Sequence, residues 1–119
     1  MVINGKTSVS ADWIDVINPA TEQVIGRVPD CTARQLDEAV AASRAAFPLW
    51  RDTPYAERQA ALAGIAGKIM DSAEELHHLL TAEQGKPLAD ALFELHAAAW
   101  WIGEIAKNEL PVTVTDAMP

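Results

Sequence analysis

The chain has 119 residues, half of them hydrophobic, and a formal net charge of −8 at pH 7. This length bounds the protein to a single domain with a small core and little surplus burial. Its nine Lys and Arg residues are scattered along the sequence, which argues against a nucleic-acid-binding surface, because neutralising phosphates requires clustered basic side chains.

The first thirty residues contain two predicted β-hairpins. Asn4-Gly5 lies between two short β-prone pieces, and Asn-Gly is a strong local hairpin signal. Two longer β-type runs follow at 13–17 and 24–28, and Pro19 stops the first of them. Because an isolated two-stranded hairpin is marginal in water, we expect these hairpins to lie against something larger. The sequence thus predicts an N-terminal β arm over residues 1–30.

The first two of four predicted helices begin at capping signals. The capping box Thr32–Gln35 opens one helix, which Pro48 is expected to end, leaving 49–52 as a connector. Thr53-Pro54 then provides a cap followed by proline at the first helical position of the next helix. Apolar residues at helical spacing carry this second helix to about Met70.

The last two predicted helices meet at a corner. Ser72–Glu75 reads as a second capping box and opens the third helix. Gly85 closes that helix, since glycine adopts the left-handed conformation at low cost. Pro87 is expected at the first position of the fourth helix, which runs to about Asn108.

The fourth predicted helix is apolar on nearly every side. Its apolar residues are Leu88, Ala91, Leu92, Phe93, Leu95, Ala97, Ala98, Ala99, Trp100, Trp101, Ile102, Ile105 and Ala106. Such a helix requires burial on nearly every side, so we expect part of its covering layer to lie outside this chain. Beyond it, Val112–Thr115 is predicted to be extended. Met118-Pro119 has no turn or cap, so we expect a truncated chain rather than a natural C-terminus.

Cys31 is the single cysteine, so no internal disulfide forms and a reducing, cytoplasmic compartment is expected. The N-terminus has no signal-peptide pattern, and no apolar run has the length of a membrane helix. Cys31 directly precedes a helix N-terminus, where the dipole favours a thiolate. The adjacent acidic Asp30 and the lack of a nearby histidine in sequence favour an ordinary loop cysteine instead.

His77 and His78 are adjacent, with Glu74 and Glu75 upstream. Two ligands on one helical face need i, i+4 spacing, so we interpret this region as a solvated helix surface rather than a metal site. His96 lies beside apolar residues and is expected to be a satisfied structural histidine.

Gly64 and Gly67 interrupt a helical pattern without following a strand, so they are not a phosphate loop, and close helix packing is the expected reason for them. Trp100 and Trp101 could stack on a ligand ring. Because their neighbours are also apolar, core packing or a subunit contact is the favoured interpretation.

Several motifs agree on one family. They are Ile17-Asn18-Pro19-Ala20-Thr21-Glu22, Val24-Ile25-Gly26-Arg27-Val28-Pro29, Ala39–Phe47 with Trp50, Glu57-Arg58, and Glu83-Gln84-Gly85-Lys86-Pro87-Leu88-Ala89 with Glu94. In this order and spacing the sequence resembles the N-terminal part of the NAD(P)-dependent aldehyde dehydrogenase superfamily.

The resemblance implies a mostly α segment with a short β-hairpin arm, forming part of an α/β Rossmann-like aldehyde dehydrogenase fold. Residues 31–119 would be the four-helix part of the cofactor-binding domain, incomplete at its C-terminus. Such enzymes use NAD or NADP and oxidise an aldehyde to a carboxylic acid through a cysteine thioester. Their catalytic cysteine, glutamate and asparagine, and their cofactor-binding residues, correspond to no residue here, and Cys31 does not stand in the nucleophile motif.

Some members of that family hold a structural monovalent cation. By the resemblance, its ligands would match the backbone oxygens of Val16 and Ile17 and the side chain of Glu94. Hard cations prefer carbonyl and carboxylate oxygens, which suits this set. The competing interpretation is that Glu94 is an ordinary surface acid.

Three functions remain open from the sequence. The first is a structural, non-catalytic segment of an aldehyde dehydrogenase, whose partner is the rest of such a chain or copies of itself. The second is a stand-alone helical interaction module derived from such an enzyme. The third is a small thiol enzyme built on Cys31.

Overall fold

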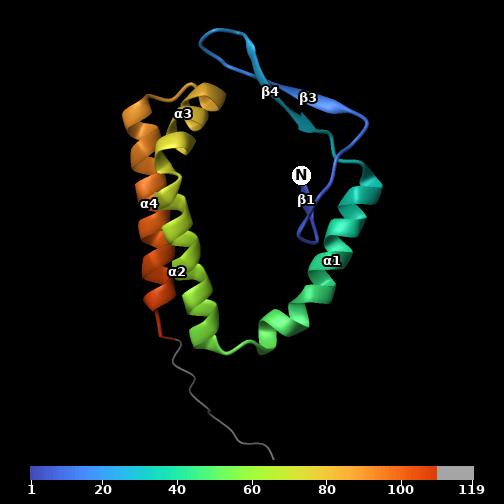
Figure 1. Cartoon of the computed structure of the whole chain (residues 1–119), viewed down its shortest axis with the longest axis vertical. Helices are drawn as coiled ribbons and strands as arrows, with labels where there is room; N and C mark the ends of the chain where they lie inside the picture. The colour runs from blue at the N-terminus through green and yellow to red at the C-terminus, as the bar shows by residue number, and fades with distance from the viewer. Residues whose placement is uncertain (110–119) are drawn as a thin grey trace, which may run out of the picture.

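A computed structural model describes residues 1–109, so the predicted extended segment 112–115 and the chain end at 118–119 lie outside the described residues. The elements, in chain order, are β1 (Val2–Ile3), β2 (Lys6–Thr7), β3 (Trp13–Ile17), β4 (Val24–Pro29), α1 (Ala33–Asp52), α2 (Tyr55–Asp71), α3 (Ala73–Gln84) and α4 (Leu88–Lys107). The fold class is therefore confirmed: mostly helical, with small antiparallel strand pairs at the N-terminus (Figure 1).

Both predicted hairpins are present. In the first, β1 pairs with β2 across Asn4 and Gly5, whose φ angles of 51° and 72° are both positive. Two positive φ angles are what a type I′ turn requires. In the second, β3 pairs with β4 from Trp13 opposite Pro29, with a bulge between Val16 and Ile17.

The first helix begins as predicted but ends later. Pro48 lies inside α1, and the expected connector 49–52 is helical, so that prediction is wrong. The φ angle of proline fits a helix, and its main cost here is one missing N–H donor close to the helix end. Thr53 does not cap α2 either, because its Oγ1 donates back to the Leu49 carbonyl at 2.8 Å. Pro54 is the N-cap of α2, so this helix begins at Tyr55, one residue later than predicted.

The Ser72 capping box is not formed. Ser72 has φ −104° and ψ 4°, and its side chain makes no capping hydrogen bond to α3. This backbone is far from the extended conformation that aims a cap side chain at the N3 amide. Ser72 instead lies in the bridge region of φ/ψ space, and its carbonyl accepts from the Leu76 N–H at the start of α3.

The corner between α3 and α4 is confirmed. Gly85 has φ 75°, and its N–H donates to the Thr81 carbonyl at 2.8 Å. A Cβ built on Gly85 would stand only 2.8 Å from Cγ of Pro19, so the loop between β3 and β4 contacts this corner. Pro87 is the N-cap of α4, so this helix begins at Leu88, one residue later than predicted.

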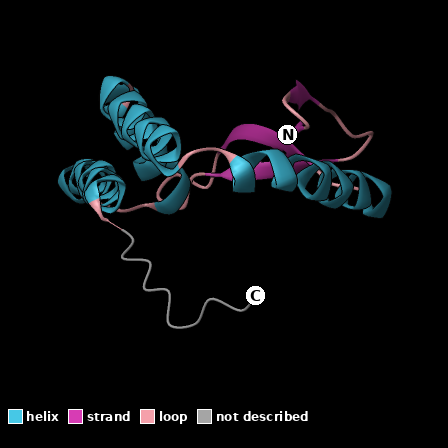
Figure 2. Cartoon of the chain, turned by 90° about the horizontal axis from the view of Figure 1, so that it is seen from below, coloured by secondary structure: helices cyan, strands magenta, loops and turns pink. Residues whose placement is uncertain are grey.

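The helices form two separate groups. α2, α3 and α4 pack on one another, whereas α1 contacts β1 and makes no comparable contact with the other helices. Figures 1 and 2 show α1 on the opposite side of the molecule from α2 and α4. Among the described residues the buried hydrophobic side chains are all alanines, namely Ala73, Ala91, Ala99 and Ala106. In the part of the chain that the structure describes, no large side chain is fully buried.

Candidate functional site

The most distinctive surface lies along α4. Phe93, His96, Ala97, Trp100 and Trp101 line a hollow of about 310 Å³, and we call these five residues the α4 apolar surface. A second hollow, of about 440 Å³, adjoins it between α2 and α4. Its lining is Ala66, Gly67, Met70, His96, Ala99 and Trp100. His96 and Trp100 belong to both hollows, so the two form one continuous apolar region.

The large side chains of this surface are exposed. Phe93 is 74% exposed, Trp100 57% and Trp101 59%. The two indole rings meet edge to face, with centroids 4.8 Å apart and an interplanar angle of 66°. Core packing within this chain is therefore the wrong interpretation of the two tryptophans, whereas a contact with another chain or segment stays a prediction. The expectation that α4 lacks part of its cover agrees with these exposures.

The helical glycines also lack the predicted packing. A Cβ built on Gly64 or Gly67 of α2, or on Gly103 of α4, meets no other atom within 4 Å. Within the described chain, close helix packing is thus the wrong explanation for Gly64 and Gly67. A glycine inside a helix costs about 0.5–1 kcal/mol relative to alanine, and nothing in residues 1–109 offsets that cost.

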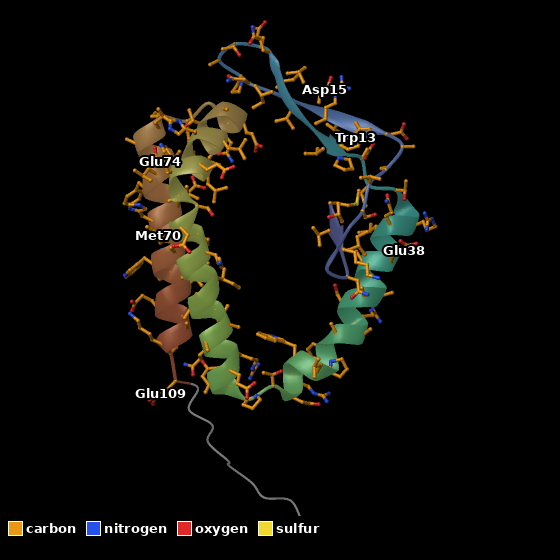
Figure 3. All side chains as sticks on the ribbon, viewed as in Figure 1. Trp13, Asp15, Glu38, Met70, Glu74 and Glu109 are labelled. Carbon is orange, nitrogen blue, oxygen red and sulfur yellow. The ribbon has the colours of Figure 1, made fainter. Side chains whose placement is uncertain are left out.

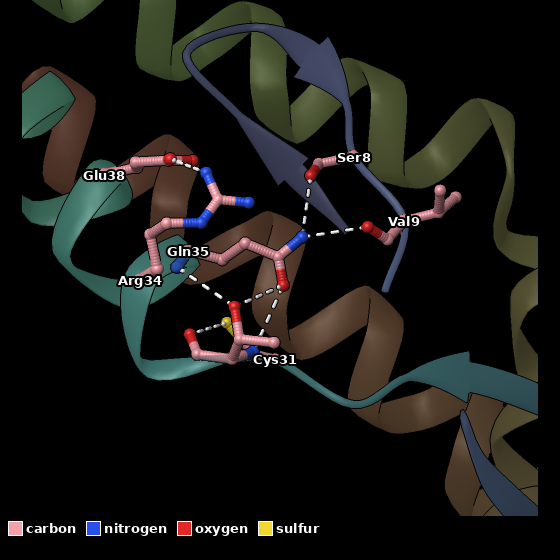
Figure 4. A network of polar contacts seen from close by, with 7 residues as sticks. Ser8, Val9, Cys31, Arg34, Gln35 and Glu38 are labelled. Atoms are coloured by element: carbon pink, nitrogen blue, oxygen red, sulfur yellow. Dashed lines mark hydrogen bonds and ion pairs between the residues drawn. The ribbon is translucent and has the colours of Figure 1, made fainter. Parts of the chain in front are cut away.

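A polar network joins the N-terminal arm to α1 (Figure 4). The Gln35 side chain is buried, and its Nε2 donates to Ser8 Oγ at 3.1 Å and to the Val9 carbonyl at 2.8 Å. Its Oε1 accepts from the Thr32 N–H at 3.1 Å, while Thr32 Oγ1 accepts from the Gln35 N–H. The predicted capping box is thus confirmed and also fixes the segment that leaves β2.

The predicted cation ligands lie on different elements. Val16 is half-buried and Ile17 is exposed, and the bulge between them disturbs the register of β3. Glu94 lies on α4, is exposed, and forms an ion pair with Lys86. In this structure the Glu94 carboxylate is therefore already matched by a side-chain cation.

Two of the three histidines, His77 and His96, differ from their sequence interpretation. His77 is buried, so a fully solvated surface is wrong at this position, although His78 and Glu74 are exposed. His96 is exposed, and no hydrogen bond to its ring is found within residues 1–109, so it is not a satisfied structural histidine.

Cys31 is exposed and unpaired, as an ordinary loop cysteine would be. Its Sγ donates to the Thr32 carbonyl at 3.6 Å, and it lines none of the hollows found here. A third hollow, of about 310 Å³, lies between the first hairpin and α1. Its lining is Val2, Ile3, Asn4, Gly5, Ala39, Ala42, Ser43 and Ala46. Within residues 1–109, none of the helices combines the length and apolar character needed to cross a bilayer.

Comparisons with known proteins agree with one another. The profile of the aldehyde dehydrogenase family matches residues 6–112. The human mitochondrial methylmalonate-semialdehyde/malonate-semialdehyde dehydrogenase [acylating] is 46% identical over 93 residues, which cover 76% of this chain and 17% of the human protein. The chain therefore spans about a sixth of the length of that relative.

Solved structures give the same result. An NADP-dependent enzyme from E. coli superposes with a TM-score of 0.85 at 33% identity, over 97% of this chain and 26% of the other. An NAD-dependent benzaldehyde dehydrogenase from Corynebacterium glutamicum superposes with a TM-score of 0.85 at 25% identity, over 96% of this chain and 27% of the other.

Proposed function

The chain belongs to the aldehyde dehydrogenase family, and from that membership we propose that it is the N-terminal part of an NAD(P)-dependent aldehyde dehydrogenase. Its own role in this proposal is structural and non-catalytic. The observation that carries the proposal is the α4 apolar surface, whose large side chains are more than half exposed. Exposed apolar patches of this kind mark contacts with other protein surfaces.

The reaction of the whole enzyme would oxidise an aldehyde to a carboxylic acid through a cysteine thioester, with NAD or NADP as hydride acceptor. Residues 1–109 do not fit this cofactor. Within residues 1–109, none of these three hollows is lined by Lys or Arg, and no helix N-terminus follows a glycine-rich turn after a strand. We therefore assign the cofactor and the reacting groups to residues other than those described here.

The partner of this surface would be the remainder of an aldehyde dehydrogenase chain or, in its absence, another copy of the same segment. On this proposal, residues 1–30 form a β-hairpin arm and residues 31–119 supply helices to the cofactor-binding domain. Apolar burial drives both contacts, so the two partners compete for the same surface.

The test is reconstitution. The isolated chain is assayed with malonate semialdehyde and benzaldehyde, using NAD or NADP, alone and after co-expression with a family member lacking its own corresponding segment. We expect no activity from the chain alone and restored activity from the pair. A Trp101→Lys chain should fail to restore activity, and a Glu104→Gln chain from the same helix should succeed. Oxidation by the isolated chain above the protein-free blank would contradict a structural role.

The alternative function is a stand-alone helical interaction module. The same α4 apolar surface favours it, because a free apolar surface also suits a separate binding partner. Reconstitution separates the two functions, since a module with an unrelated partner would not restore oxidation to a truncated dehydrogenase.

We also propose the cation site formed by the Val16 and Ile17 carbonyls and Glu94. A bulge frees backbone groups from the strand ladder, which supports a role for these carbonyls. Cation binding would require Glu94 to exchange Lys86 for the ion. Thermal unfolding in NaCl or KCl should occur at a higher temperature than in choline chloride of equal ionic strength. Glu94→Gln should remove that difference, and a difference that persists in the variant contradicts the site.

A cytoplasmic location is proposed from the single, unpaired cysteine. The human relative is named as mitochondrial, so fractionation of cells producing the whole protein is the appropriate test.

A further inference from the structure

A second cluster of side chains lies on α3 and shares no residue with the α4 apolar surface. Glu74, His77 and His78 each offer one ligand atom, and these three atoms all lie within 4.8 Å of one another. The two imidazole rings have centroids 4.1 Å apart and are tilted by 39°. Adjacent helical positions diverge by about 100°, which is why sequence spacing argued against a shared site. The side-chain conformations bring the two rings together all the same.

The ring of His77 is oriented by a hydrogen bond to a backbone carbonyl, as metal-binding histidines usually are. His77 is only 7% exposed, and its Nδ1 lies 3.0 Å from the Ala73 carbonyl oxygen. A carbonyl can only accept, so Nδ1 must carry the hydrogen, and the lone pair is left on Nε2. Metal-ligating histidines almost always donate their other ring N–H in this manner, which fixes both tautomer and ring orientation.

The other two ligands are free to adjust. The side chains of His78 and Glu74 are 59% and 89% exposed, and His78 Nε2 stands 3.8 Å from Glu74 Oε1. Figure 3 shows Glu74 at the end of the helical group that carries α3. Tetrahedral Zn²⁺ with ligands at about 2.0–2.1 Å needs them roughly 3.3 Å apart. A modest change of rotamer in His78 and Glu74 would bring their ligand atoms to that separation, while His77 keeps its position.

We propose that Glu74, His77 and His78 form a site for a first-row divalent cation, with Zn²⁺ as the representative ion. Two imidazoles and one carboxylate suit zinc, copper or nickel, whereas magnesium and calcium prefer all-oxygen ligands. Solvent water completes the coordination, because the exposed side of the cluster is open. This site is independent of the proposed dehydrogenase role and would persist in the isolated chain or in a whole enzyme.

The experiment is a calorimetric titration of the chain with ZnCl₂, in a Cys31→Ser background that removes the competing thiol. We expect one ion per chain. His78→Ala and Glu74→Gln remove exposed ligands without disturbing packing, and each should weaken Kd by about ten-fold or more. His77→Gln tests the buried ligand, and circular dichroism checks that this variant keeps its helices.

Matched controls come from neighbouring residues of the same types. Glu75→Gln and His96→Ala should leave Kd unchanged, because neither residue belongs to the cluster. Co²⁺ offers a second readout, since its visible absorption reports coordination by nitrogen and oxygen ligands. Equal affinity in His78→Ala, loss of affinity in His96→Ala, or no saturable binding up to millimolar Zn²⁺ would each overturn the proposal.

Discussion

Replacing Trp101 by alanine should weaken self-association of the isolated chain. Trp101 is 59% exposed, which for a tryptophan is roughly 150 Å² of surface. At about 25 cal/mol per Å², covering that area would stabilise a contact by about 3–4 kcal/mol. Alanine retains part of the area, so we expect a loss of about 2 kcal/mol, or roughly 30-fold in the dimer Kd.

Sedimentation equilibrium over a range of concentrations measures that dimer Kd directly. Glu104→Ala is the matched control, because it truncates a side chain on the same helix that lies outside the α4 apolar surface. The reasoning is refuted if the parent chain is monomeric at all concentrations. It is equally refuted if Trp101→Ala and the control associate alike, since the contact would then not involve this surface.

Three further outcomes are expected. Gly85→Ala should lower the free energy of unfolding by more than about 1 kcal/mol, because φ 75° is strained for alanine. Gly64→Ala should raise the free energy of unfolding by about 0.5–1 kcal/mol. Chemical unfolding measures both changes. Gln35→Ala should lower the free energy of unfolding by about 2 kcal/mol, since it removes the buried network, with faster amide exchange in the first hairpin as the local readout. The Arg51 guanidinium holds the pKa of the Asp52 carboxyl below its usual value, so any stabilisation by this pair is present at neutral pH and is lost as the pH falls through that lowered pKa. An NMR titration of Arg51→Ala should show the Asp52 pKa moving back up.

Local signals in the sequence predicted most of the fold. Asn4-Gly5 specified its hairpin because only a few residues accept two positive φ angles, and Gly85 specified the corner for the same reason. The Thr32 capping box formed because the cap residue has an extended backbone, with φ −72° and ψ 155°. These features depend on a few neighbouring residues, so the sequence carries them in full.

The wrong predictions concern residues whose type allows two local conformations, such as a proline that can end a helix or lie within it. Pro48 lies near the C-terminal end of α1, where the preceding turns already make their backbone hydrogen bonds. The one N–H donor that proline lacks does not end the helix there. Ser72 has the residue type of a cap, but its backbone lies in the bridge region rather than the extended region, so its side chain is not aimed at the N3 amide of α3. The burial of His77 could not be predicted because it depends on how α3 sits against its neighbours.

The distribution of burial explains why the sequence could identify a family but no reacting group. Within residues 1–109 the buried hydrophobic side chains are alanines of α3 and α4, whereas large apolar side chains are exposed on α4 and on both β3 and β4. Alanine contacts let helices approach but bury little surface, so they stabilise weakly. The separation of α1 from the other helices adds to this weak stabilisation, because within residues 1–109 its main tertiary contact is with β1 of the first hairpin. On the proposed function, a layer built in this way is stabilised mainly by the part of the enzyme that it covers, and the reacting groups are expected in that covered part.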